Sequence, residues 1–173
     1  MSVSKFINPE EWKNIERGYY YQAAMYYLSN TMQPLRFLER INDGETYKIN
    51  TRTGNFDAVN GRAVEQDIVV TLKPRQVIVL SNDRLNQNKG FEYVQILPIF
   101  SLKHSDSVNS WYDNLKKDLH PGFVYIPRGR YGLAVDLTQV STIHKSLLLK
   151  KQTKVPKDRM NFIDSQALEL LDL

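Results

Sequence analysis

Short apolar runs, each bounded by turn residues, are the feature that most constrains how this chain folds. Such runs between Gly, Pro, Asn and Ser are typical of strands. Several of them at close spacing predict an α+β, mainly β fold: a small, strongly bent β-barrel with helices outside it. The runs lie at residues 67–72, 76–80, 93–97, 123–126, 133–136 and 139–143. The residues expected in the barrel core are Ile68, Val70, Val77, Val79, Ile96, Val124, Val140 and Ile143.

The N-terminal region carries helix signals instead. Asn8 is a good N-cap residue, Pro9 suits the first helical position, and apolar residues recur at helical spacing from Trp12 to about Asn30. A second run with one apolar helical face covers residues 34–41. We therefore predict a helical hairpin at the N-terminus.

These patterns divide the chain into three parts and one insertion. A long polar insertion covers residues 104–121, with a helical turn near Trp111, and a C-terminal helix is expected to begin at a cap on Asp164 or Ser165. The predicted parts are a helical hairpin extension over 1–43, a connecting β and turn segment over 44–64, and the barrel with its C-terminal helix over 65–173.

Composition excludes several classes of protein. The 173 residues contain no cysteine and three histidines that lie far apart, which excludes a disulfide scaffold and a thiolate zinc site and argues against any metal centre. No apolar run approaches the ~20 residues that a membrane helix needs. The N-terminus also lacks the apolar segment of a signal peptide. We expect a cytoplasmic protein without cofactor or metal.

The charge is distributed unevenly. The formal net charge is −1 over residues 1–72, +8 over 73–159 and −3 over 160–173. A basic middle segment is typical of an anion-binding surface, although a solvated surface rich in lysine gives the same pattern. The basic side chains expected to share a polyanion-binding surface are Lys73, Arg75, Arg84, Arg128 and Arg130.

Four segments carry motifs in a recognisable order. Residues 66–70 read Gln-Asp-Ile-Val-Val, and residues 75–81 read Arg-Gln-Val-Ile-Val-Leu-Ser before an Asn-Asp turn. Residues 97–101 read Leu-Pro-Ile-Phe-Ser, and residues 135–143 read Val-Asp-Leu-Thr-Gln-Val-Ser-Thr-Ile. Together they resemble the strands of the MazF/PemK family of toxins from bacterial toxin–antitoxin systems.

The resemblance implies a compact SH3-like barrel of the MazF/PemK/CcdB type. It implies a homodimer that cleaves single-stranded RNA without metal and is neutralised by an antitoxin. The 2′-hydroxyl would attack the neighbouring phosphate, which needs a cation for the phosphorane and a group that moves a proton. Arg75 matches the family's catalytic arginine, and Ser101 is the nearest hydroxyl because Phe100 stands at the family's threonine. The RNA-binding candidates are Lys73, Arg84, Arg128, Arg130 and Gln139.

The chain also departs from the family pattern. The loop between the family's first two strands, which helps form its groove, is shortened here to residues 73–75, and Gln76 replaces a proline. The N-terminal helices and the 104–121 insertion are additional. His104, Asp106 and His120 offer replacement acid–base groups, or lie in an ordinary surface loop.

Three functions remain open from the sequence. The first is a toxin-like endoribonuclease, and the second is a catalytically silent module that binds a protein or nucleic acid partner. The third is the related gyrase-poisoning branch of the same fold, which needs no catalytic arginine. The segment at 75–81 favours the first over the third, whereas Phe100 and the short loop favour the second. Arg75 also has a structural alternative, an ion pair with Asp67 or Asp83.

Overall fold

The computed structural model describes residues 5–26, 35–40, 47–52, 58–59, 62–63, 67–70 and 72–172. The chain forms two compact units, and each is described by itself. The first comprises residues 1–25 and 74–173, and the second comprises residues 26–73.

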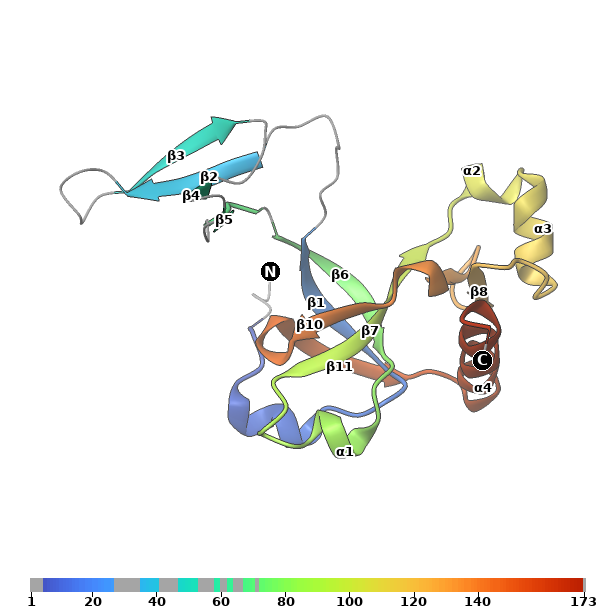
Figure 1. Ribbon diagram of the computed structural model, residues 1–173. Coiled ribbons are helices and arrows are strands. Elements are labelled where there is room, and N and C mark those ends of the chain that lie inside the picture. Colours follow the sequence, from blue (N-terminus) through green and yellow to red (C-terminus); the bar gives the residue numbers. More distant parts are fainter. Residues whose placement is uncertain are drawn as a thin grey trace. The chain divides into compact units, whose positions relative to one another are not determined.

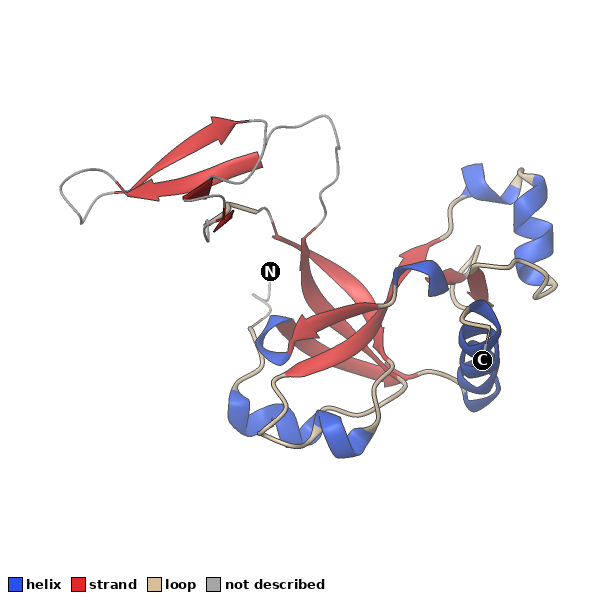
Figure 2. Ribbon diagram, in the orientation of Figure 1, coloured by secondary structure: helices blue, strands red, loops and turns tan. Residues whose placement is uncertain are grey.

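One seven-stranded sheet organises the first unit (Figures 1 and 2). Its main path runs in the order β11-β1-β6-β7-β9-β8, and β10 pairs with β7 beside this path. The pairs with a described register are antiparallel. The strands are β1 (Tyr19–Tyr26), β6 (Leu72–Val79), β7 (Tyr93–Ser101), β8 (Phe123–Ile126), β9 (Leu133–Asp136), β10 (Ser141–His144) and β11 (Leu148–Lys154).

Helices lie outside this bent sheet, so the mainly β fold class predicted from the sequence is confirmed. They are η1 (Pro9–Asn14), α1 (Asp83–Asn86), α2 (His104–Ser107), α3 (Ser110–Lys116), η2 (Leu137–Gln139), η3 (Lys145–Leu147) and α4 (Lys157–Leu170). Helix α4 begins earlier than the predicted cap at Asp164, because Pro156 occupies the N-cap position.

Two core clusters lie on the two faces of the central strands. Val77 and Val79 of β6 belong to the first cluster, whereas Ile78 between them belongs to the second. This is the side-chain alternation of a strand buried on both faces. The second cluster also holds Ile163 of α4, so the terminal helix covers that face.

The core prediction is confirmed for five of its eight residues and wrong for three. Val77, Val79, Ile96, Val124 and Ile143 are buried. Ile68, Val70 and Val140 are exposed. Ile68 forms an isolated bridge and Val70 lies in no strand. The apolar residues of the 67–72 run therefore do not pack into the core.

The predicted N-terminal helical hairpin is wrong within the described residues. Only Pro9–Asn14 is helical, as a 3₁₀ segment, and Tyr19–Tyr26 forms strand β1. Tyr20 packs into the second core cluster and Tyr21 into the first. A strand buried on both faces has a continuous apolar run, and here that run happens to match helical spacing. Residues 1–25 are therefore part of the sheet unit and not an extension.

The predicted short connection at residues 73–75 is also wrong. Lys73, Pro74 and Arg75 lie inside β6, and the strand beside β6 is β1 rather than residues 67–72. The chain between β1 and β6 makes up the second unit, which the sequence prediction had divided between an extension and a connecting segment.

Short strands make up the described part of the second unit. Strand β2 (Leu35–Arg40) pairs with β3 (Tyr47–Arg52), and β4 (Ala58–Val59) pairs with β5 (Arg62–Ala63). The predicted second helix at 34–41 is therefore wrong over residues 35–40. The turns predicted at 42–44, 53–55 and 60–61 lie outside the described residues. No helix in the described ranges is long and apolar enough to span a membrane.

Candidate nucleic-acid interface

Arg75 lies exposed on β6, two residues before the buried Val77. Strand pairing runs from Val79↔Ile96 to Val77↔Pro98. This pairing ends there, and the continuation of β7 pairs with β9, where Phe100 lies opposite Ala134. Because side chains alternate along a strand, Arg75 is on the same face of β6 as Val77. Phe100 lies beside the third core cluster, to which Ala134 and Leu102 belong.

Ser101 lies on the other face. Along β7, Leu97 and Ile99 belong to the second core cluster, and Ser101 continues that alternation. Ser101 pairs with Leu133, which belongs to the same cluster. The catalytic role predicted for Ser101 stays a prediction.

Aromatic rings continue the row that begins at Phe100. Phe100 meets Phe123 of β8 edge-on at 5.4 Å between ring centroids, and Phe123 stacks on His120 at 4.6 Å. Trp111 of α3 meets His120 edge-on at 6.4 Å. Phe100 is 38% exposed, and the other three side chains are partly exposed.

The His120 ring is held by the backbone of its own loop. The N–H groups of Gly122 and Phe123 both donate to His120 Nδ1, at 3.2 Å each. Nδ1 therefore carries no proton, and the neutral imidazole has its proton on Nε2. His104 is exposed on α2, and Asp106 accepts the Lys103 N–H in the same turn. The carboxylate of Asp106 is thus engaged in capping α2.

Arg128 and Arg130 lie in the turn between β8 and β9, where Gly129 and Gly132 have positive φ. The Arg128 guanidinium lies 5.2 Å over the ring of Tyr20, and that of Arg130 lies 5.3 Å over the ring of Tyr131. Cation–π contacts of this kind hold a guanidinium on an apolar surface while leaving its donors accessible.

Tyr20 is almost fully buried beneath Arg128, at 2% exposure. Among the described residues, the guanidinium of Arg128 is the polar group that faces its ring. Burial raises the pKa of Tyr20, and the positive charge of Arg128 opposes that rise. The phenol is therefore a neutral support for the arginine at physiological pH.

The remaining predicted RNA-binding residues are dispersed. Arg84 is exposed on α1, which follows β6 at the end away from Arg75. Gln139 is exposed at the end of η2, two residues before Ser141, which pairs with Ile96. Lys73 is exposed on β6 but belongs to the second unit. The structure thus places Arg84 apart from Arg75 along β6.

The Ser-Asn-Asp segment after β6 has a structural role. Ser81 Oγ donates to Asn86 Oδ1 at 2.6 Å, and Asn86 Nδ2 donates to the Ser81 carbonyl at 2.7 Å. Asn82 caps α1 by accepting the Leu85 N–H. Lys145, also buried, donates to the Leu85 and Asn88 carbonyls at 3.1 and 2.9 Å, and desolvation lowers its pKa. The polar groups of this segment stabilise the loop and are not assigned to a ligand site.

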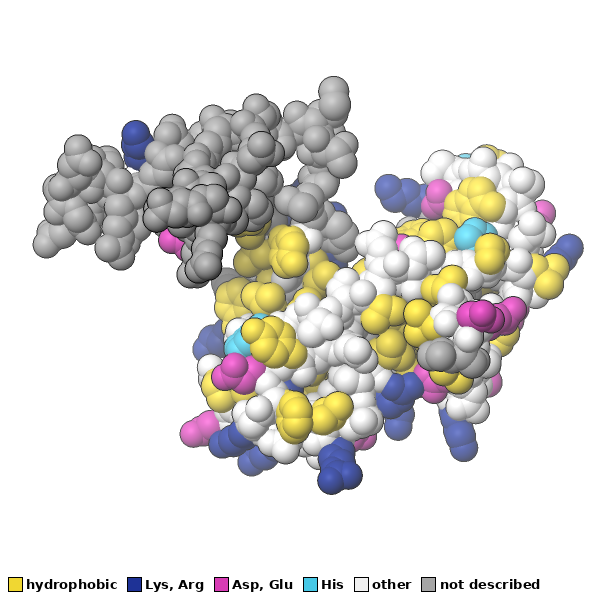
Figure 3. Space-filling model, in the orientation of Figure 1, with side chains coloured by type: hydrophobic (Ala, Val, Ile, Leu, Met, Phe, Trp, Pro, Cys, Tyr) yellow, Lys and Arg dark blue, Asp and Glu magenta, His cyan; other side chains and the backbone are white. Residues whose placement is uncertain are grey.

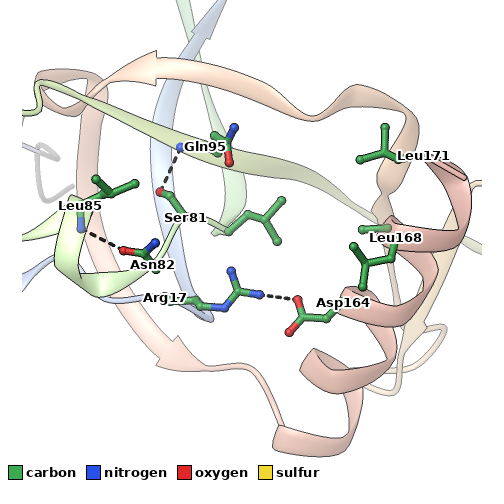
Figure 4. Close-up of a pocket in the computed structure, with 10 residues that line it drawn as sticks. Arg17, Ser81, Asn82, Leu85, Gln95, Asp164, Leu168 and Leu171 are labelled. Atoms are coloured by element: carbon green, nitrogen blue, oxygen red, sulfur yellow. Dashed lines mark hydrogen bonds and ion pairs between the residues drawn. The ribbon is translucent and has the colours of Figure 1, made fainter. Parts of the chain in front are cut away.

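A pocket of about 340 Å³ lies between α4 and the loop after β6 (Figure 4). Its walls are largely apolar, and Arg17 pairs with Asp164 at one side. The apolar lining residues include Leu80, Leu85, Leu168 and Leu171. No predicted site residue is among the described residues that line it. The residues described in the structure also contain no cluster of His, Asp and Glu able to hold a metal ion.

Sequence reasoning missed the aromatic row and the support beneath Arg128. Phe100 was treated only as a departure from a threonine, and Tyr20 was assigned to a helix. The only signal in the sequence was a density of aromatic residues near the 104–121 insertion, which carries no information about which rings meet.

Comparisons with known proteins agree with the sequence resemblance. Residues 69–171 match the family model described as PemK-like, MazF-like toxin of type II toxin-antitoxin system. No curated protein matches the chain.

Solved structures that match this chain at low identity include the two that follow. One is an endoribonuclease in complex with its cognate antitoxin from a mycobacterial species, at 13% identity and a TM-score of 0.49, covering 92% of this chain and 96% of that one. Another is MazE-MazF from Deinococcus radiodurans, at 15% identity and a TM-score of 0.43, covering 85% of this chain and 98% of that one. Because the family model spans more than half of the sequence, this chain belongs to the PemK-like, MazF-like toxins of type II toxin–antitoxin systems.

Proposed function

We propose that this protein is a toxin that cleaves single-stranded RNA without a metal ion and is neutralised by an antitoxin. The observation that carries the proposal is the position of Arg75, which is exposed on β6 within the residues that match the family model. The basic stretch over residues 73–159 supports an anionic substrate. The family's typical homodimer is part of the proposal.

The proposed reaction needs a stabilising cation, a base that takes the proton of the 2′-hydroxyl and an acid that gives a proton to the leaving oxygen. The 2′-hydroxyl oxygen forms a bond to the adjacent phosphorus and loses its proton to a base, while the bond from phosphorus to the 5′-oxygen breaks and that oxygen gains a proton. The products are a 2′,3′-cyclic phosphate and a 5′-hydroxyl. Arg75 stabilises the extra charge on the phosphorane, because a guanidinium can donate to two phosphate oxygens at once.

Ser101 remains the proposed hydroxyl of the site, because it is the hydroxyl residue nearest to the position of the family's threonine. Phe100 stands at that position and has no proton to transfer. This substitution favours a second candidate function, in which the protein binds RNA or a protein partner without cleaving it. A cleavage assay separates the two functions.

The assay uses a panel of single-stranded RNAs in excess EDTA, with Arg75→Ala, Arg75→Lys and Arg84→Ala. We expect the wild type to cleave, Arg75→Ala to lose about 10²–10³ in rate and Arg75→Lys to recover part of it. Arg84→Ala is the matched control, since Arg84 is an exposed arginine at the other end of β6. Ser101→Ala is expected to lose less rate than Arg75→Ala, because water can partly replace a hydroxyl.

Two results contradict the proposed mechanism, and a third contradicts the nuclease itself. Cleavage that survives Arg75→Ala removes the proposed role of the arginine, and cleavage of an RNA whose 2′-hydroxyl at the scissile position is replaced by hydrogen removes the mechanism. Binding of RNAs across the panel without cleavage of any of them overturns the nuclease and supports the silent module. The antitoxin and the homodimer are tested separately, by co-purification with the product of a neighbouring reading frame and by light scattering of the purified chain.

A further inference from the structure

The aromatic row Phe100–Phe123–His120–Trp111 covers the outer face of β7 and β8 and reaches α3. Successive centroids lie 5.4, 4.6 and 6.4 Å apart, so the rings form one continuous surface. Its side chains are partly exposed rather than buried, whereas Leu102 and Leu115 beneath them are at most 5% exposed. Figure 3 shows hydrophobic and histidine side chains gathered over the region of α3 and β8.

The orientation of the rings is fixed by their surroundings. His120 cannot rotate freely because two backbone N–H groups donate to its Nδ1. Phe100 is held edge-on by Phe123 at an interplanar angle of 86°. Rigid aromatic rings bind a flat ligand at a low cost in side-chain entropy.

Cationic side chains lie over two other rings of the same hydrophobic cluster. Lys116 lies 5.6 Å over the Tyr112 ring and Arg130 lies 5.3 Å over the Tyr131 ring. Tyr112 belongs to the third core cluster, and Trp111, Phe123 and Tyr131 pack against it. The nearby Asp118 is already neutralised by Arg159.

Alternating flat apolar surface and positive charge are the chemistry that binds unpaired nucleotides. Bases stack on aromatic rings, and phosphates contact the cations. We propose that Phe100, Phe123, His120 and Trp111 form a stacking track for unpaired bases of single-stranded RNA, with Lys116 and Arg130 as the cations nearest in the same cluster. This proposal rests on the proposed RNA-directed function and adds the part of the surface that holds the bases.

The test measures RNA binding separately from cleavage. The probe is a fluorescein-labelled single-stranded oligonucleotide with 2′-methoxy groups, which cannot be cleaved, and affinity is measured by fluorescence anisotropy. The variants are Phe100→Leu and Trp111→Leu, because leucine keeps the side chain apolar and removes the ring. The matched control is Phe91→Leu, since Phe91 is also exposed but precedes the opposite end of β7.

We expect Phe100→Leu and Trp111→Leu each to weaken binding about tenfold, which corresponds to about 1.4 kcal/mol. Phe91→Leu should bind within twofold of the wild type. The slope of log affinity against log salt concentration should be the same in all three variants as in the wild type, because no phosphate contact is removed. Melting temperatures close to that of the wild type verify that the variants are folded.

A second probe carries abasic sites in place of consecutive bases, and it completes a double-mutant cycle. If bases stack on the track, the abasic probe binds the wild type more weakly, and Phe100→Leu adds little further loss. Fully additive losses would overturn the proposal, and so would unchanged affinity of both ring variants.

The outcomes distinguish this proposal from the proposed function. A wild type that cleaves RNA, with Phe100→Leu binding the uncleavable probe normally, overturns the track and leaves the nuclease intact. A wild type that binds no single-stranded oligonucleotide overturns both. If Phe100→Leu instead changes only the oligomeric state of the protein or its binding to an antitoxin, the rings form a protein interface and the track is overturned.

Discussion

Arg159 of α4 holds Asp118 through two hydrogen bonds, from Nη1 to Oδ2 at 2.8 Å and from Nη2 to Oδ1 at 2.6 Å. Asp118 follows α3 and has a positive φ of 59°. The pair joins the C-terminal helix to the segment that carries Trp111 and His120. The carboxylate also raises the pKa of Arg159, so the arginine is charged at every accessible pH.

Replacing Asp118 by asparagine should destabilise the protein by about 1–2 kcal/mol, because a partly buried, doubly hydrogen-bonded charge pair is lost. Asparagine tolerates the left-handed conformation, so the backbone is not strained. The control is Asp113→Asn, at an exposed position on α3. Urea unfolding measures both, and equal stability of the two variants would contradict the role of the pair.

Gly132 is expected to tolerate no side chain. Its φ is +90°, and a Cβ atom there would fall inside the ring of Tyr125. Gly132→Ala should therefore cost about 3 kcal/mol, from left-handed strain and displacement of the ring. Gly129 has a φ of +70° with open space around it, so Gly129→Ala should cost only about 1 kcal/mol. Similar melting temperatures for the two variants would contradict this interpretation.

Alkaline pH should weaken the fold through Tyr21. Burial raises the pKa of Tyr21 to about 12 from an ordinary value of 10.0, and its hydroxyl donates to the Asn14 carbonyl. The unfolded chain therefore loses this proton first as pH rises, so stability is full below pH 10 and falls towards pH 12. A shift of this size corresponds to about 3 kcal/mol.

Chemical unfolding of the wild type and Tyr21→Phe at pH 9 and pH 12 measures that loss. The phenylalanine variant should lose less stability over this range, while burial of Tyr20 preserves part of the dependence. Tyr93→Phe is the control, because Tyr93 is 58% exposed. Parallel curves for the wild type and Tyr21→Phe would contradict the assignment.

Arg128 and Arg130 should each contribute one phosphate contact to RNA binding. Glutamine at either position should reduce the slope of log affinity against log salt by about 0.7, the value per phosphate for single strands. Arg84→Gln should leave the slope unchanged, because Arg84 lies on α1 at the far end of β6 from Arg75. The measurement is a salt titration with the uncleavable oligonucleotide, and equal slopes in all variants would remove both arginines from the interface.

The sequence predicted strands best where a short apolar run lies between turn residues. The segments at 123–126 and 133–136 are strands β8 and β9 as expected. It failed for Tyr19–Tyr26, because a strand buried on both faces lacks the alternation that identifies strands. It also failed at Pro74, since a proline between two apolar runs indicates a turn, although its fixed φ is compatible with extended backbone.

The candidate site could be predicted only in part. Arg75 was identified from the run that follows it, which is a local pattern. The contacts of Phe123 with Phe100 and with His120 depend on strand register and loop conformation. Ser101 and Phe100 point to opposite faces of β7 because successive side chains of a strand alternate. An error of one residue in placing the strand therefore moves every side chain to the other face.

The position of β1 delays completion of the sheet during synthesis. This first strand lies between β6 and β11, and Tyr21 pairs with Lys151 near the other end of the chain (Figure 1). After β1 has been synthesised, one of its edges stays uncovered until β6 has been made, and the other stays uncovered until β11 has been made. Over that interval the growing chain carries a tyrosine-rich strand with an unpaired edge. Unpaired strand edges are prone to aggregate or to be captured by chaperones.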